Sequence, residues 1–249
     1  MPCADRRARI VWQALPDPQR WIEAAVAAIR GALEAELATH ATTWLLLSGG
    51  STPAPVYRAL AEQALPWARV VVSLVDERDV PPEAEGSNAR LLGETLRHAN
   101  AAAARFVPLR APGHTLDAAV AARNAQWPFA SSEVGYAQPT FALAVLGMGE
   151  DGHTASLFAG AANLDAALAS RQPYAAIDAH GCAGAGAWPR RISLTPIGLA
   201  QARRRLLLLR GADKRAAFER ALADGDARAL PIRLAIDLDG PPLQVCWCE

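Results

Sequence analysis

Lysine is almost absent from this sequence. Of its 25 basic residues, 24 are arginine and only Lys214 is lysine. Arginine presents a planar fork of donors whereas lysine presents a compact ammonium, so most cationic positions here accept the forked group. Lys214 is therefore a candidate for a site that needs a compact charge, although chance retention explains a lone lysine equally well until its neighbours are considered.

Long apolar runs and an excess of charge are missing as well. No stretch approaches the ~18 apolar residues that cross a bilayer. Residues 1–7 carry charges but lack the apolar segment of a signal peptide. The formal net charge is zero, which argues against nucleic acid or an anionic membrane as the main partner.

Cysteine is sparse, and its positions do not suggest a disulfide framework. The four cysteines are scattered, at Cys3, Cys182, Cys246 and Cys248. The last two flank Trp247 in an expected strand, where both side chains point to one face, so we interpret them as structural. A reducing cytoplasm is the location that we expect.

Hydrophobic residues make up 51% of the 249 residues, enough for a sizeable core. Apolar runs of strand length alternate with helical spacing, which predicts one α/β domain over residues 1–249, with a mostly parallel sheet and helices on both faces. The expected strands are residues 9–15, 44–47, 70–75, 105–109, 141–146, 205–209 and 243–248, with a weaker one at 175–177. The expected helices are residues 17–38, 115–127 and 212–222, with helix starts at 53, 87, 196 and 231.

The first loop whose residues suggest a chemical role is residues 48–53, which read Ser-Gly-Gly-Ser-Thr-Pro between an expected strand and an expected helix. Glycines expose backbone N–H groups, a helix start adds positive potential, and two hydroxyls add donors, as in a phosphate cradle. The Gly-Lys-Ser/Thr ending of a nucleoside triphosphate loop is missing. A capped turn without a ligand is the simpler alternative.

Charged residues follow other strands. Asp76-Glu77-Arg78 comes after residues 70–75, where it suits a polyol and an anion, although a surface ion pair is commoner for such a sequence taken alone. Lys214 begins the helix after residues 205–209, and beside an anion-binding loop its ammonium is better explained as a phosphate ligand. Arg191 is a second candidate anion ligand, whereas the adjacent Arg190 is expected to face solvent.

The glycine turn at residues 147–153 reads Gly-Met-Gly-Glu-Asp-Gly-His after a buried strand. It matches the dinucleotide fingerprint, but that pattern alone is weak, and two carboxylates would lie beside a pyrophosphate. His153 offers an imidazole, the side chain type best suited to general-base catalysis at neutral pH, and Asp151 is close enough to orient it. A histidine that merely caps the next helix is the structural alternative.

Taken together, these stretches resemble the 6-phosphogluconolactonases, within the glucosamine-6-phosphate isomerase/6-phosphogluconolactonase superfamily. The matching segments are residues 47–53, 76–81 with 87–88, 146–158, 191–195 and 211–214. The resemblance implies the fold of ribose-5-phosphate isomerase and the CoA transferases. It also implies hydrolysis of 6-phospho-D-glucono-1,5-lactone by water in the oxidative pentose phosphate pathway, with no required cofactor.

The resemblance also implies roles for individual residues. His153 looks like the general base, with Asp151 beside it as the second catalytic residue. The expected substrate-binding residues are Gly49, Gly50, Ser51, Thr52, Asp76, Arg78, Asn88, Gly149, Arg191 and Lys214. Gly50, Ser51, Thr52, Arg191 and Lys214 look like the phosphate ligands among them. No spacing of ligand residues indicates a metal, and we expect a monomer or weak homodimer.

The sequence departs from the family pattern at Ala159, where proline is common, at Ser193, where threonine is usual, and in the Gly/Ala-rich residues 181–189. Two other functions remain open. An amino-sugar phosphate isomerase/deaminase usually has Asp-Glu-Tyr at positions 76–78 and Asn-Glu-Pro after the histidine segment, whereas this chain has no carboxylate between His153 and Asp165. A non-catalytic sugar-phosphate sensor could lose the His153 and Asp151 pair, and it often adds a DNA-binding helix-turn-helix.

Overall fold

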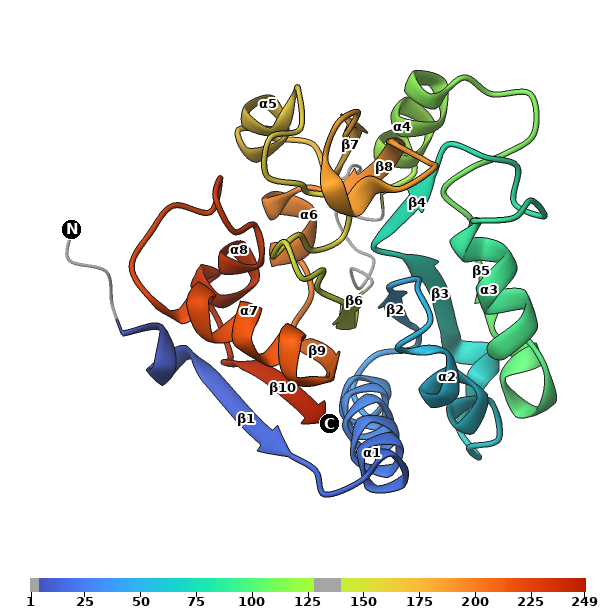
Figure 1. Ribbon diagram of the computed structural model, residues 1–249. Helices are drawn as coiled ribbons and strands as arrows, with labels where there is room; N and C mark the ends of the chain where they lie inside the picture. Colours follow the sequence, from blue (N-terminus) through green and yellow to red (C-terminus); the bar gives the residue numbers. More distant parts are fainter. Residues whose placement is uncertain (1–4, 128–139) are drawn as a thin grey trace.

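The computed structural model describes residues 5–127 and 140–249 of the chain (Figure 1). Cys3, one of the four cysteines, lies outside the described residues. Within them, two sheets are present, and they differ in the direction of their strands.

The larger sheet has seven strands, and every neighbouring pair is parallel. This confirms the predicted parallel sheet. In spatial order the strands are β1 (Ile10–Ala14), β10 (Leu243–Cys248), β9 (Arg205–Arg210), β6 (Thr140–Leu146), β2 (Thr43–Leu47), β3 (Val70–Leu74) and β5 (Arg105–Phe106). All residues of β3 and β6 are buried, as expected of strands covered on both faces.

The smaller sheet was not predicted. It is antiparallel, with the order β4 (Asp76–Arg78), β8 (Arg190–Leu194) and β7 (Tyr174–Asp178). Only Val75 separates β3 from β4, so the chain passes directly from one sheet to the other. The N–H of Leu194 donates to the carbonyl of Val75 at 2.8 Å and fixes this crossing. A three-residue strand is too short to show alternation, which is why residues 76–78 looked like a loop.

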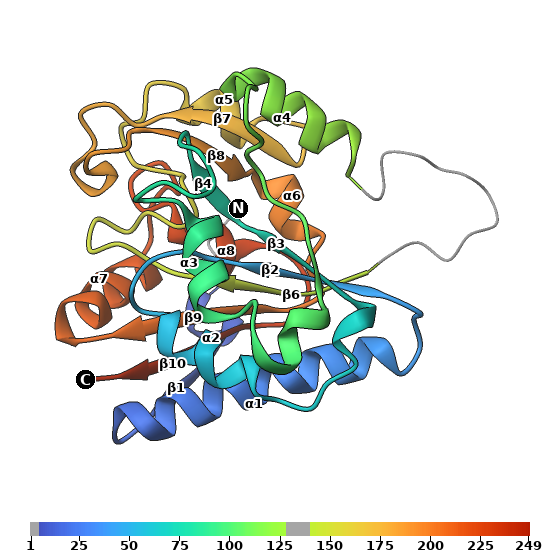
Figure 2. The ribbon, with the colours of Figure 1, turned by 90° about the vertical axis from the view of Figure 1, so that its right-hand side faces the viewer.

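Helices cover both faces of the larger sheet, with α1 and α2 on one face and α7 and α8 on the other (Figures 1 and 2). Asp17 caps α1 as predicted, since its side chain accepts from the N–H of Arg20 at 2.8 Å. No helix in residues 5–127 and 140–249 has the length and apolarity to span a membrane. The helices are α1 (Pro18–Leu37), α2 (Ala54–Ala61), α3 (Asn88–Thr95), α4 (Leu116–Ala125), α5 (Leu164–Leu168), α6 (Pro196–Ala200), α7 (Ala212–Leu222) and α8 (Ile232–Asp237).

Cys246 and Cys248 are both buried in β10, as expected of structural cysteines. Burial raises the pKa of the Cys246 thiol to about 11, so it is protonated near neutral pH. These two residues therefore contribute to packing.

Glu77 is a fully buried carboxylate that joins β4 to the start of α3. Its oxygens accept from the backbone N–H groups of Asn88 and Ala89, each at 2.8 Å, and from the Ser87 hydroxyl at 3.0 Å. These N–H groups belong to the first turn of a helix, which has no partners for them within the helix. Burial raises the pKa of Glu77, and the N–H donors of Asn88, Ala89 and Arg78 oppose that shift.

We predict that Glu77→Ala lowers the free energy of unfolding by about 3 kcal/mol or more, because several buried donors lose their acceptor at about 1–3 kcal/mol each. Urea unfolding followed by circular dichroism measures the change. The exposed Glu83 provides the matched control, since Glu83→Ala should change stability by no more than about 0.5 kcal/mol. Equal effects of the two substitutions would contradict the capping role of Glu77.

Candidate active site

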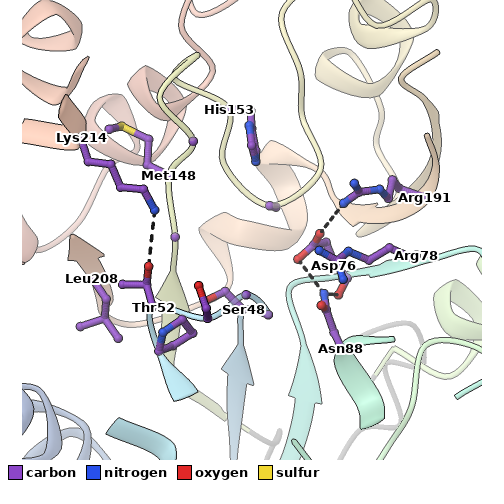
Figure 3. A pocket seen from close by; sticks show the side chains of 17 residues that line it. Ser48, Thr52, Asp76, Arg78, Asn88, Met148, His153, Arg191, Leu208 and Lys214 are labelled. Carbon is purple, nitrogen blue, oxygen red and sulfur yellow. Dashed lines mark hydrogen bonds and ion pairs between the residues drawn. The ribbon is translucent and has the colours of Figure 1, made fainter. Parts of the chain in front are cut away.

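The carboxyl ends of β2, β3, β6 and β9 open onto one cavity of about 210 Å³ (Figure 3). Each strand is followed by one of the segments that the sequence singled out. Ligands of open α/β sheets bind at this edge. The cavity is lined by Ser48, Gly49, Gly50, Ser51, Thr52, Pro53, Asp76, Arg78, Asn88, Gly147, Met148, Gly149, His153, Ala155, Arg191, Leu208 and Lys214.

One end of the cavity is suited to an anion. Lys214 lies in the first turn of α7, and its Nζ approaches the Oγ1 of Thr52 at 3.4 Å (Figure 3). Thr52 in turn lies just before α2, in the glycine loop that follows β2. Burial lowers the pKa of Lys214, and the negative charge of Glu150 opposes the shift. An ammonium, a hydroxyl and a helix start therefore meet in one place, as a phosphate group requires.

His153 points into the cavity between Lys214 on one side and Arg191 on the other (Figure 3). Its Nδ1 lies 2.6 Å from Oδ1 of Asp151, and the same oxygen accepts from its backbone N–H at 3.2 Å. Burial opposes ionisation of Asp151, but the hydrogen bond and charge of His153 outweigh it, so the pKa of Asp151 lies below its usual value. A carboxylate only accepts, so Nδ1 carries the proton and Nε2 is the basic nitrogen of neutral His153.

The opposite end of the cavity is built around Asp76, which is buried at the start of β4. Its Oδ2 accepts from the Ser156 hydroxyl at 2.5 Å and lies 3.9 Å from Nη1 of Arg191. The Asn88 amide donates to the Asp76 carbonyl at 2.8 Å. Burial lowers the pKa of Arg191, and the carboxylate of Asp76 opposes the shift. This network holds a carboxylate and two donors at fixed positions along the cavity wall.

Two buried atoms of cavity-lining residues have no hydrogen-bond partner within residues 5–127 and 140–249. They are Nε of Arg78 and Oδ1 of Asn88. A buried polar atom without a partner costs about 1–3 kcal/mol, so such atoms beside a cavity favour ligand binding. Gly49 lies against the Asn88 amide, where any Cβ would overlap it. The predicted glycine at position 49 is therefore required by this close approach.

Twelve residues were predicted from the sequence as catalytic or substrate-binding. Eleven of them line the cavity, and the exception is Asp151. Asp151 contacts His153 instead of lining the cavity, which fits its expected orienting role. Arg191 lies across the cavity from Lys214, beside Asp76 (Figure 3). Its expected contact with the phosphate stays a prediction.

Sequence reasoning missed Ser156, whose hydroxyl holds Asp76, although it lies in the quoted segment at residues 146–158. Nothing local marks this serine, because its partner is 80 positions away. It also missed the contact of residues 182–188 with Arg191, whose guanidinium donates to the carbonyl of Ala185 at 2.7 Å. Within the described part of the chain, no group of three or more His, Cys, Asp or Glu side chains is placed to hold a metal ion.

Comparison with known proteins gives consistent matches over nearly the whole chain. The family model described as glucosamine-6-phosphate isomerases/6-phosphogluconolactonase matches residues 16–244. A 6-phosphogluconolactonase of Xylella fastidiosa is 45% identical over 241 residues, which cover 97% of this chain and 97% of that protein. One of Rhizobium meliloti is 37% identical over 231 residues, covering 93% of this chain and 95% of that protein.

Solved structures agree with the fold. The crystal structure of a 6-phosphogluconolactonase from Shewanella baltica superposes with a TM-score of 0.83 at 29% identity. The superposition covers 96% of this chain and 98% of that one. The same α/β arrangement is thus present in a protein of similar length.

Proposed function

The chain belongs to the glucosamine-6-phosphate isomerase/6-phosphogluconolactonase family, and from that premise we propose that it hydrolyses 6-phospho-D-glucono-1,5-lactone to 6-phospho-D-gluconate. The observation that carries the proposal is the cavity itself. It combines an anion-binding end, at Thr52 and Lys214, with an oriented histidine, His153. The closely related proteins named 6-phosphogluconolactonase support the choice of substrate.

The phosphate end supplies binding energy far from the reacting carbon. Ser51, Thr52 and Lys214 hold the 6-phosphate, together with the backbone of Gly50. This contact fixes the lactone ring in the cavity, so that its carbonyl carbon lies beside His153. Asp76 and Asn88, on the opposite wall, accept from or donate to ring hydroxyls.

His153 acts on water. Its Nε2 takes a proton from a water molecule as the oxygen attacks the lactone carbonyl carbon, and the C=O electrons move onto the carbonyl oxygen. When the tetrahedral intermediate collapses, the bond to the ring oxygen breaks, and the imidazolium returns the proton to that oxygen. The products are a carboxylic acid, which ionises, and a free hydroxyl. Asp151 holds the Nδ1 proton throughout and so fixes the ring orientation.

The developing oxyanion needs a donor, and Arg78 is the residue that we assign to it. Its Nε is buried beside the cavity without a partner in the described part of the chain. The N–H groups of Gly149 and Gly152 in the glycine turn already donate to the carbonyls of His153 and Gly149. A fixed guanidinium aimed at developing negative charge lowers the barrier without reorganisation.

Several wider features belong to the same proposal. We place the whole chain, residues 1–249, in one domain, since the family model covers 16–244 and one core cluster draws on both sheets. We also propose a cytoplasmic location, a monomeric or weakly dimeric state and no nucleic-acid partner, as expected at the outset. The deaminase alternative is disfavoured, because Asp76 is the one carboxylate among the described residues that line the cavity.

We predict that the protein accelerates the disappearance of freshly made 6-phosphogluconolactone over its spontaneous hydrolysis, and that His153→Ala lowers this catalysed rate at saturating substrate by about 10²–10⁴-fold. A coupled assay for 6-phosphogluconate measures both rates. The control is His180→Ala, since His180 forms the same contact with Asp178, at 2.5 Å, on the exposed surface. A near-parent rate for His153→Ala, or release of ammonia from glucosamine 6-phosphate, would contradict the proposal.

Lys214→Ala tests the phosphate end separately. Loss of a charged hydrogen bond to phosphate should reduce kcat/KM for the phosphorylated lactone by about 10–100-fold. The value for unphosphorylated glucono-1,5-lactone should stay unchanged. Arg30→Ala is the control: it removes an exposed cation that pairs with Glu34 in α1, and it should change neither kcat/KM value. A parent-like ratio of the two substrates in Lys214→Ala would exclude Lys214 as the phosphate ligand.

A further inference from the structure

Segment 182–188, part of the Gly/Ala-rich stretch in which the sequence departs from its family, lies against the active site from outside the cavity lining. The carbonyls of Ala185 and Trp188 accept from the guanidinium of Arg191, the former at 2.7 Å. The Trp188 ring lies 5.7 Å from the guanidinium carbon of Arg78. The segment is thus tied to both arginines that line the cavity.

Gly184, within this segment, lies directly against the catalytic pair. A Cβ atom at this position would be 2.6 Å from Oδ2 of Asp151 and 2.8 Å from Nδ1 of His153. Carbon atoms do not approach polar atoms so closely without displacing them, so position 184 leaves room for hydrogen only. The backbone of Gly184 does not have a positive φ angle, so space alone requires glycine here.

Gly149, in the glycine turn after β6, lies against Asp151 and His153 as well. A Cβ atom there would overlap Nδ1 of His153 and Oδ1 of Asp151. The hydrogen bond between Asp151 and His153 therefore lies between two glycines that are 35 positions apart in the sequence and belong to different loops. The Asp151 carboxylate contacts position 149 through Oδ1 and position 184 through Oδ2, which restricts its rotation.

We propose that Gly184 is a positioning residue for the reaction: its backbone, held in place by Arg191, confines the Asp151 carboxylate to the orientation that bonds His153 Nδ1. The proposal rests on the proposed function, in which His153 is the base. A methyl group at position 184 pushes the Asp151 carboxylate aside, and the imidazole loses the partner that fixes its tautomer. Gly184 touches no reacting atom and acts through Asp151.

The test compares Gly184→Ala with the parent in lactone hydrolysis and in proton NMR. We expect kcat to fall by about 10²-fold, as for a catalytic group displaced by about 1 Å, with KM nearly unchanged. The hydrogen-bonded Nδ1 proton of His153, identified by its loss in His153→Ala, should disappear from the downfield spectrum. Gly31→Ala is the matched control, because a Cβ at that exposed helical position meets nothing within 4 Å.

A parent-like kcat for Gly184→Ala, or a low kcat with the Nδ1 resonance intact, would overturn the assignment. In the Asp151→Asn variant, adding Gly184→Ala should cause no further loss of kcat. If the two fold-losses instead multiply in the double variant, the assignment is overturned as well. If Gly184→Ala does not fold, adding Asp151→Ala removes the carboxylate that the methyl meets. Recovered folding then supports the proposal, and continued failure contradicts it. A parent without lactonase activity refutes the proposed function alone, because the NMR comparison still decides the role of Gly184.

Discussion

The carboxyl ends of four neighbouring parallel strands meet at one edge of the larger sheet, and most groups that line the cavity depend on that alignment. The register of β2 against β3 and β6, and of β6 against β9, brings together distant loops, so that Thr52 and Lys214 meet although they are 162 positions apart in sequence. The passage from β3 into β4 through Val75 extends this edge into the second sheet. Asp76 and Arg78 reach the cavity because the chain changes sheets there.

Burial then determines what each charged group does. Asp76 has a serine hydroxyl and a guanidinium as partners, and Asp151 has the imidazole, so both carboxylates are held in one orientation. A buried charge is costly unless it is paired and hydrogen-bonded, which makes these contacts mutually dependent. Within residues 5–127 and 140–249, the Lys214 ammonium has a single long hydrogen-bond contact, with Thr52 at 3.4 Å, and it lines the cavity. Its ammonium is accordingly the group best placed to take an anionic ligand.

Much of this arrangement follows from local sequence. The Asp17 cap of α1, the buried runs of β3 and β6, and the glycine loops after β2 and β6 all have signals within a few residues. The lone lysine was informative because arginine occupies every other cationic position. These signals were sufficient for the parallel sheet and for most of the cavity lining.

The remainder depends on contacts between distant residues. Ser156 becomes important through Asp76, Glu77 through the first turn of α3, and Gly184 through a carboxylate in another loop. A serine, a glutamate or a glycine carries no local mark of such a contact. The antiparallel sheet was missed for the same reason, since β4 is three residues long and pairs with β8 more than 100 positions later. Three-dimensional packing alone reveals these roles.

The central claim is that one cavity binds the phosphate at one end and presents the lactone carbonyl to His153 between the two ends. A crystal structure with 6-phospho-D-gluconate bound tests it most directly. We predict phosphate oxygens within hydrogen-bond distance of Thr52 and Lys214, and the product carboxylate beside Nε2 of His153. A phosphate bound against Asp76 and Ser156, with the carboxylate at Lys214, would contradict it.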